Sequence, residues 1–242
     1  QWGSIAQLAA EYETIAAAAQ HDRWAALIRC SGLSDEQAES AIESEAFGPL
    51  AAELRRAEAN HHNLDALLPR LVAARGFDDA DDIAAVLHYR VERATGRPAG
   101  SGRTRKPARL IAGLIPSAHG VIDVEMRAAL DEREELIEAR ADGVLEAALT
   151  ENAPWTNALG AAPTDRQRVA AWCKAARVVA AYRDRYRLTG DTPLGTAPES
   201  AAQKIDATRA RAALDRTLNV ARVEQDQEHS RRARTQRTGP SL

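Results

Sequence analysis

The chain has 242 residues, of which 45% are hydrophobic and 28% are charged, and its formal net charge is −3. This length can bury a substantial core in one large helical domain or in two small ones. No stretch approaches about 18 consecutive apolar residues, and no basic segment precedes an apolar one near the start. We therefore predict neither a membrane span nor a signal peptide.

Two further features bear on the setting of the protein. Cys30 and Cys173 lie far apart, and neither belongs to a CxxC pair. This favours a reduced, cytoplasmic location, with a disulfide between the two cysteines left open. The chain begins with Gln1 rather than Met, so we expect it to be a fragment of a longer protein.

The first helices are indicated by capping residues that precede apolar runs of helical spacing. Ser4 can cap a helix whose pattern ends near Gly32, and glycine is a favourable residue just beyond a helix. Ser34, with Gln37 three residues later, has the form of a capping box. We expect this box to open a short helix that ends near Ser44.

Two prolines mark the next helices. Pro49 suits the first turn of a helix that carries Leu54 on its apolar face. Pro69 falls in the middle of an apolar run that ends at Gly76. A helix therefore either begins near Pro69 or is kinked by it.

Four aspartates lie just before another helical pattern, and they are Asp78, Asp79, Asp81 and Asp82. Carboxylates at the N-cap and in the first turn stabilise a helix by about 0.3–1 kcal/mol each, because backbone N–H groups lack partners there and the helix dipole is positive. A calcium loop would need a glycine at its turn and a glutamate about twelve residues after the first ligand, and neither is in place. The cluster therefore predicts a helix start rather than a metal site.

The second half of the chain follows a segment rich in glycine, proline and basic residues. After it we expect a short helix over residues 108–116 and a long helix capped by Asp123. A turn from Pro154 to Gly160, a helix capped by Thr164 and a last helix from near Glu199 complete the pattern.

Because every apolar pattern long enough to judge has a helical period, we predict an all-α fold, a multi-helix bundle-like array without a sheet. Two helical halves are joined by a linker, and the last residues are too polar to fold. The predicted divisions are an N-terminal helical half at 1–96, a flexible basic linker at 97–108, a C-terminal helical half at 109–228 and a disordered basic tail at 229–242.

Signatures of catalysis are weak throughout the sequence. The segment GRPAGSGRTRK lacks the spacing of a phosphate loop, and no strand pattern precedes it. His61 and His62 are adjacent and would point about 100° apart on a helix, so only one of them could join Glu58 or Asp65 around a metal ion. A polar helix junction is the alternative. We expect no catalytic residue, no cofactor and no metal.

Two basic clusters are the stronger indication of a binding function. Flexible basic segments gain affinity for phosphate backbones because binding releases counterions. The candidate nucleic-acid contacts are Arg97, Arg103, Arg105, Lys106 and Arg109 in and after the linker, and Arg231, Arg232, Arg234 and Arg237 in the tail. The alternative is a solvated linker and tail, because the chain is slightly acidic and lacks the aromatic residues that alternate with basic ones in single-strand grooves.

Six segments of the chain have a distinctive order and spacing. They read RWAALIRCSGLSDEQ, LLPRLVAARGFDDADDIAAVLHYRVERATG, LIAGLIP, MRAALDEREELIEARA, APWTNALGAAP and VAAYRDRYRL. In this arrangement, from Tyr12 to about Ile205, the chain resembles the C-terminal helical region of actinobacterial MobF-type conjugative relaxase–helicases, which process plasmid DNA for transfer.

The resemblance implies an accessory role for this chain. In that family a relaxase domain nicks one DNA strand, a helicase with phosphate-loop motifs follows, and the helical region comes last. None of the nicking or ATPase motifs occurs here, so no catalytic residue carries over. We expect a non-catalytic interaction module that docks the DNA-processing protein to transfer-machinery or relaxosome proteins. The alternative is a non-specific single-stranded DNA-binding accessory domain that uses the basic linker and tail.

Overall fold

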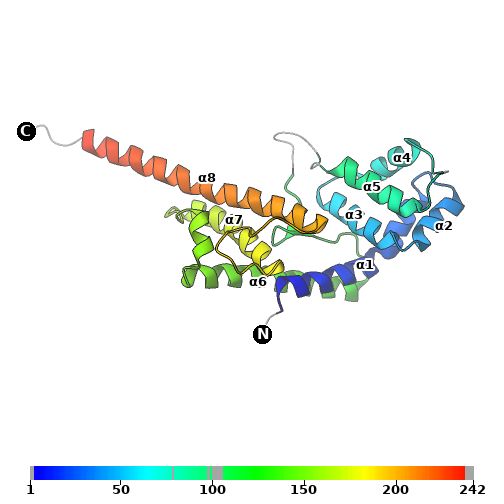
Figure 1. The fold of residues 1–242 in the computed structure, drawn as a ribbon, viewed down its shortest axis with the longest axis horizontal. Helices are drawn as coiled ribbons and strands as arrows, with labels where there is room; N and C mark the ends of the chain where they lie inside the picture. Colours follow the sequence, from blue (N-terminus) through cyan, green and yellow to red (C-terminus); the bar gives the residue numbers. More distant parts are fainter. Residues whose placement is uncertain (1–2, 78, 97–98, 100–105, 238–242) are drawn as a thin grey trace, which may run out of the picture. The chain divides into compact units, whose positions relative to one another are not determined.

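The structure is a computed structural model that describes residues 3–77, 79–96, 99 and 106–237, with side chains described up to residue 224. About 69% of the chain is helical, and the described residues form nine helices and one two-stranded sheet (Figure 1). The prediction of an all-α helical array is confirmed. None of the helices in these residues is both long and apolar enough to cross a bilayer.

The chain divides into two compact units, which we name after helices that lie wholly within each. The α3–α5 unit contains residues 9–111 and 115–135, and the α7–α8 unit contains residues 1–8, 112–114 and 136–242. These boundaries differ from the predicted division at the linker, because residues 109–111 and 115–135, which follow the linker, belong to the α3–α5 unit. The first five helices are α1 (Ile5–Arg29), α2 (Asp35–Glu43), α3 (Phe47–Ala59), α4 (Leu64–Ala73) and α5 (Ile83–Thr95).

The core of the α3–α5 unit is mostly aliphatic and contains one tryptophan, Trp24, and two phenylalanines, Phe47 and Phe77. Trp24, Leu50, Leu54, Leu68 and Leu87 are all fully buried in one cluster that joins α1, α3, α4 and α5. Burying a leucine side chain stabilises a fold by roughly 1.5–3 kcal/mol, so this cluster is the main source of the unit's stability.

Several predicted helix boundaries are confirmed. Ser34 and Gln37 form the reciprocal capping box of α2, and the Ser4 hydroxyl accepts the backbone N–H of Gln7 at the start of α1. Pro49 lies in the first turn of α3. Pro69 lies inside α4, which begins at Leu64, so the alternative of a helix that begins near Pro69 is wrong.

The aspartate cluster marks a helix start, but fewer of its members take part than predicted. Asp82 is the N-cap of α5, where its carboxylate accepts the N–H of Ala85 at 3.1 Å and the hydroxyl of Ser44 at 2.7 Å. The hydrogen bond from Ser44 and that from Ala85 lower the pKa of Asp82. Since α5 begins at Ile83, the two exposed members Asp79 and Asp81 precede the helix, and the prediction that acids fill its first turn is wrong. Asp78 lies outside the described residues.

The short helix predicted over residues 108–116 is a β-hairpin. Strands β1 (Leu110–Ile111) and β2 (Ile115–Pro116) pair antiparallel, with Ile111 opposite Ile115. Ala112 and Gly113 have φ angles of 47° and 74°, which a right-handed helix cannot contain. A short apolar run does not distinguish helix from strand, and this one was assigned incorrectly.

Long-range hydrogen bonds hold the segment after the linker in the α3–α5 unit. The N–H of Arg109 donates to the carbonyl of Ala59 at 2.9 Å, and the N–H of Ala118 donates to the Tyr12 hydroxyl at 2.7 Å. Gln20, which is fully buried, donates to the carbonyl of His119 at 2.7 Å. These partners lie far apart in the sequence, which explains why the boundary between units could not be read from local composition.

The α7–α8 unit contains most of α6 (Val124–Thr150), the 3₁₀ helix η2 (Pro154–Leu159), α7 (Arg166–Arg185) and α8 (Ala201–Arg237). Asp123 caps α6 as predicted, by accepting the N–H of Met126 at 2.8 Å. Asp165, and not Thr164, caps α7. Helices α7 and α8 pack along each other, and Trp155 and Trp172 are buried in this unit.

Helix α8 continues past residue 228, where we expected the helical half to end and a disordered tail to begin. Its backbone is helical to Arg237. Four of the nine residues from 229 to 237 are arginine, which is a strong helix former, and this accounts for the difference. The side chains of this stretch lie outside the described part.

Candidate nucleic-acid interface

Two of the nine predicted nucleic-acid contacts have described side chains. Lys106 lies near the end of the linker and Arg109 directly follows the linker, and both are exposed. The remaining predicted contacts lie outside the described side chains, and they are Arg97, Arg103, Arg105, Arg231, Arg232, Arg234 and Arg237.

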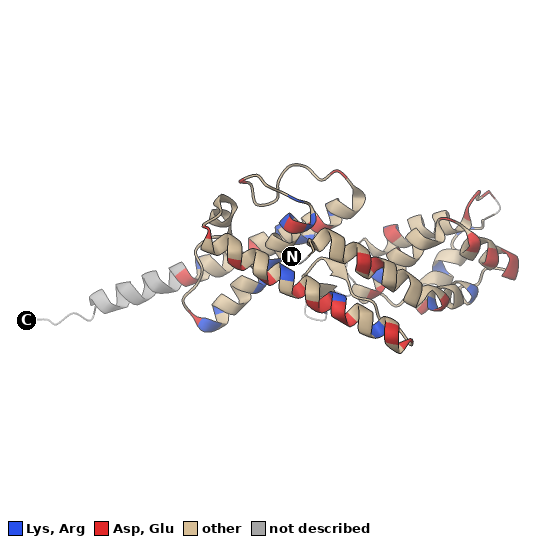
Figure 2. Cartoon of the chain, turned by 90° about the horizontal axis from the view of Figure 1, so that it is seen from below, with Lys and Arg blue, Asp and Glu red and all other residues tan. Residues whose placement is uncertain are grey.

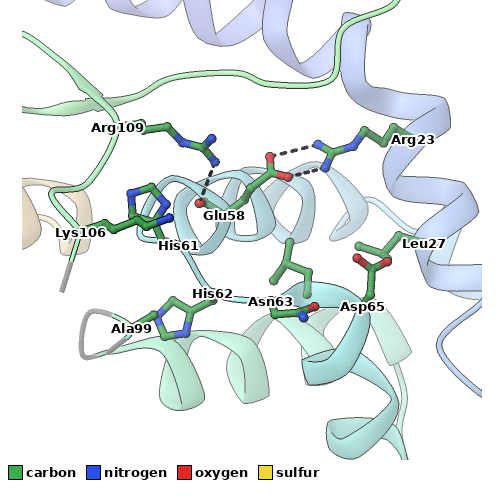
Figure 3. A pocket seen from close by; sticks show the side chains of 11 residues that line it. Arg23, Leu27, Glu58, His61, His62, Asn63, Asp65, Ala99, Lys106 and Arg109 are labelled. Carbon is green, nitrogen blue, oxygen red and sulfur yellow. Dashed lines mark hydrogen bonds and ion pairs between the residues drawn. The ribbon is translucent and has the colours of Figure 1, made fainter. Parts of the chain in front are cut away.

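Lys106 and Arg109 line a cavity of about 690 Å³ in the α3–α5 unit (Figure 3). The cavity lies between α1, the connection from α3 to α4, the start of α4 and the end of the linker. Its lining residues are Arg23 and Leu27 from α1, Glu58 from α3, His61, His62 and Asn63 from the connection, Leu64 and Asp65 from α4, and Ala99, Lys106 and Arg109.

The connection from α3 to α4 is fixed by a left-handed turn at His61. The N–H of His61 donates to the carbonyl of Glu58 at 2.9 Å, and the N–H of His62 donates to that of Ala57 at 3.0 Å. This is the Schellman arrangement, in which the residue after the C-cap usually is glycine because its φ is positive. His61 occupies that position with φ 64°, and its Nε2 lies 2.8 Å from the carbonyl oxygen of Pro107. His61 therefore connects the α3–α4 connection to the end of the linker at Pro107.

The charges at the back of the cavity neutralise each other. The two terminal nitrogens of Arg23 donate to the two carboxylate oxygens of Glu58, one of them at 3.0 Å. The hydrogen bond to Glu58 raises the pKa of Arg23. Arg23 also donates to the carbonyl of His119 at 3.2 Å, and its guanidinium lies 4.4 Å from the centre of the Trp24 ring. Arg23 is thus a structural cation whose charge is already balanced.

His119 lies close to this ion pair without adding a charge to it. Burial lowers the pKa of His119, and the nearby cation Arg109 lowers it further. Because the ordinary histidine pKa is about 6.5, a lowered value keeps the His119 ring neutral at pH 7.

Lys106 and Arg109 have donors left for a ligand. Among the described residues the Lys106 ammonium has no hydrogen-bond partner, and Arg109 uses one terminal nitrogen to donate to the Glu58 carbonyl at 3.2 Å. In the lining as a whole, three cations (Arg23, Lys106 and Arg109) oppose two carboxylates (Glu58 and Asp65), which leaves one positive charge when the histidines are neutral. Acidic and basic side chains are interspersed elsewhere on the helices (Figure 2).

The start of α4 adds a partial positive charge to the cavity wall. Asn63 caps this helix by accepting the N–H of Ala66 at 3.1 Å, and Leu64 and Asp65 form its first residues. The N–H groups of a first helical turn point outward and favour an anion. The Asp65 carboxylate at the same end opposes this effect, so the free cations of Lys106 and Arg109 carry the attraction.

Sequence patterns did not predict that α1 and the α3–α4 connection line this cavity. Arg23 comes from the middle of an ordinary helix, and only its pairing with Glu58 in the fold connects it to the linker. His61 and His62 were considered as metal ligands. Within the described residues, no group of three or more histidine, cysteine, aspartate or glutamate side chains could hold a metal ion.

No family model matches this chain, and neither a curated protein nor a solved structure matches it.

Proposed function

We propose that this chain is a non-catalytic accessory module that holds a single nucleic-acid strand by its phosphates, in a cytoplasmic conjugative relaxase–helicase. The observation that supports strand binding is the cavity in which the described end of the basic linker, Lys106 and Arg109, lies beside the start of α4. The conjugative setting rests on the resemblance of the sequence segments alone.

A phosphate group fits the donors of this cavity. An ammonium and a guanidinium with unused N–H groups form charge-assisted hydrogen bonds with phosphate oxygens. In the sequence, Arg105 directly precedes Lys106 and Arg103 lies two residues before Arg105, so both are further candidate contacts of the same strand. Such contacts read no base, and we expect dissociation constants of roughly 10⁻⁴–10⁻⁶ M near physiological salt.

Fluorescence anisotropy with a labelled oligothymidine, measured from low to high salt, tests this proposal. The variant Lys106→Gln/Arg109→Gln should weaken binding. It should also reduce the salt slope by about 1.4, because each of the two phosphate contacts accounts for about 0.7 of the slope on a single strand. The matched control Lys174→Gln/Arg187→Gln removes two exposed cations outside the cavity and should change the slope less.

Two outcomes would contradict strand binding at this cavity. Binding that survives both the substitutions and high salt would mean a different, shape-specific site. Binding that depends only on Arg231, Arg232, Arg234 and Arg237, tested by changing them to glutamine, would place the contact in α8 instead.

Docking to a protein of the transfer machinery is the second candidate function. It is favoured by three exposed apolar side chains at the start of α6, where Ile122, Val124 and Met126 are 88%, 74% and 37% exposed. The variant Ile122→Ser/Val124→Ser should lower plasmid transfer by the parent protein while its oligothymidine affinity and melting temperature stay the same. Unchanged transfer would argue against docking through this surface.

A further inference from the structure

A second cavity, in the α7–α8 unit, has the composition of a small-molecule site. Its volume is about 520 Å³, within the range of roughly 300–1,000 Å³ that is usual for ligand pockets. Small apolar residues of α6, among them Gly143, Val144 and Ala147, form one wall, and the buried Trp155 of η2 forms another. The charged residues in its lining are few, namely Arg140, Glu151 and Asp184, and a small number of polar groups is usual in ligand pockets.

Gly143 leaves an open space on the cavity wall, and no other part of the described fold occupies that space. A glycine inside a helix costs about 0.5–1 kcal/mol relative to alanine, so it usually permits a close approach by another group. A Cβ added at Gly143 would meet no heavy atom within 4 Å. Nothing in the described fold therefore requires the glycine, and the open space above it suits an apolar ligand that contacts the helix backbone.

One end of the cavity is occupied by an ion pair that is already complete. The guanidinium of Arg140 donates to both carboxylate oxygens of Asp184, at 2.6 and 3.3 Å. Asp184 also accepts the N–H of Ile5 at 2.7 Å. Neither charge of this pair is left to attract a ligand.

The opposite end carries an unbalanced negative charge. Glu151 is exposed and lines the cavity just after α6 ends, and within the described residues its carboxylate has no hydrogen-bond or ion-pair partner. The last turn of α6 contains no basic residue. Because the helix dipole is negative at its C-terminus, a carboxylate there is unfavourable and a cation is favoured.

We infer that this cavity binds a small molecule with an apolar body and a positively charged head group, such as an alkyl or arylalkyl amine. The head group lies at Glu151, and the body lies over Gly143 and against Trp155. From Gly143 to the end of α6 the helix rises about 10 Å, which sets the length of the body.

Three probes of equal length and different charge test the inference on the full chain: hexylamine, hexanol and hexanoate. Chemical-shift changes of the Trp155 indole N–H report binding at this cavity. Hexylamine should bind most tightly and hexanoate most weakly. Glu151→Gln should weaken hexylamine about two- to fivefold, the effect of a partly exposed ion pair, without changing hexanol. Glu146→Gln, an exposed carboxylate on the same helix outside the cavity, should leave all three unchanged.

Substitution of the glycine tests the position of the apolar body. Gly143→Ala should weaken all three probes and Gly143→Leu should abolish their binding, while circular dichroism shows an intact helical fold. Gly48→Ala is the matched control, since a Cβ there also meets nothing within 4 Å. Hexanoate binding as tightly as hexylamine, an unchanged affinity in Glu151→Gln, or undiminished binding in both Gly143 variants would each overturn the inference.

Discussion

Two substitutions of His61 can measure two opposing contributions to stability at the proposed strand-binding cavity. One is the cost of the left-handed backbone conformation of His61, and the other is the gain from the hydrogen bond of its ring. His61 has φ 64°, and a non-glycine residue in this conformation costs roughly 1–2 kcal/mol. Its ring lies at hydrogen-bonding distance, 2.8 Å, from the Pro107 carbonyl oxygen, and an exposed hydrogen bond of this kind contributes about 0.5–1.5 kcal/mol.

The variant His61→Gly should therefore be more stable than His61→Ala. This order is the reverse of that inside a helix, where alanine stabilises more than glycine. His61→Ala removes the hydrogen bond and keeps the strain, so its free energy of unfolding should fall by about 1 kcal/mol. His61→Gly removes the same hydrogen bond but relieves the strain, and its greater freedom in the unfolded chain offsets part of the gain. We expect the glycine variant to be about 1 kcal/mol more stable than the alanine variant, a difference of about 2–4 °C in melting temperature for a chain of this size.

Thermal and urea unfolding of both variants measure this difference, and anisotropy with oligothymidine measures the function. Both variants should bind the strand more weakly, because the segment that carries Lys106 loses the His61 contact and is then held only through Arg109. Arg187 provides the control, since it has φ 52° at the equivalent position after α7. The glycine and alanine variants of Arg187 should show the same stability difference and should bind the strand equally. A His61→Gly variant less stable than His61→Ala would refute the reasoning.

Two further predictions concern the caps and the hairpin. Asp82→Ala should lower the free energy of unfolding by about 1 kcal/mol, whereas Asp79→Ala and Asp81→Ala should each change it by less than about 0.5 kcal/mol. Because folding lowers the pKa of Asp82, its stabilisation is complete above the unfolded-state pKa and disappears as the pH falls through the folded-state value. Urea unfolding at pH 7 and at successively lower pH should therefore show a difference from wild type that shrinks as the pH falls, and a difference that stays constant would contradict it. Gly113→Ala should lower the free energy of unfolding by more than about 1 kcal/mol, because φ is 74° at this position and the new Cβ would lie 2.5 Å from the Val178 side chain. A melting temperature equal to that of the wild type would argue against this hairpin.

Local patterns in the sequence determined the helical elements and several of their ends. Apolar residues at helical spacing identified the long helices, and Ser34 with Gln37 located the start of α2 because a capping box involves only residues three apart. Asp123 was assigned correctly as a cap for the same reason, and the aspartate cluster located the start of α5, although Asp82 is the only described member of the cluster that caps it. The all-helical character follows from such local interactions, which do not depend on the rest of the fold.

Only the tertiary structure decided the hairpin, the division into units and the proposed strand-binding cavity. The run from Leu110 to Pro116 is too short to show a period, and its conformation depends on pairing and on the close approach of Gly113 to Val178. Arg109 joins α3 through a hydrogen bond to Ala59, fifty residues earlier in the chain. The cavity likewise combines residues from α1, α3, α4 and the linker. Contacts between residues so far apart depend on how buried surfaces fit together, and no local pattern in one sequence contains that information.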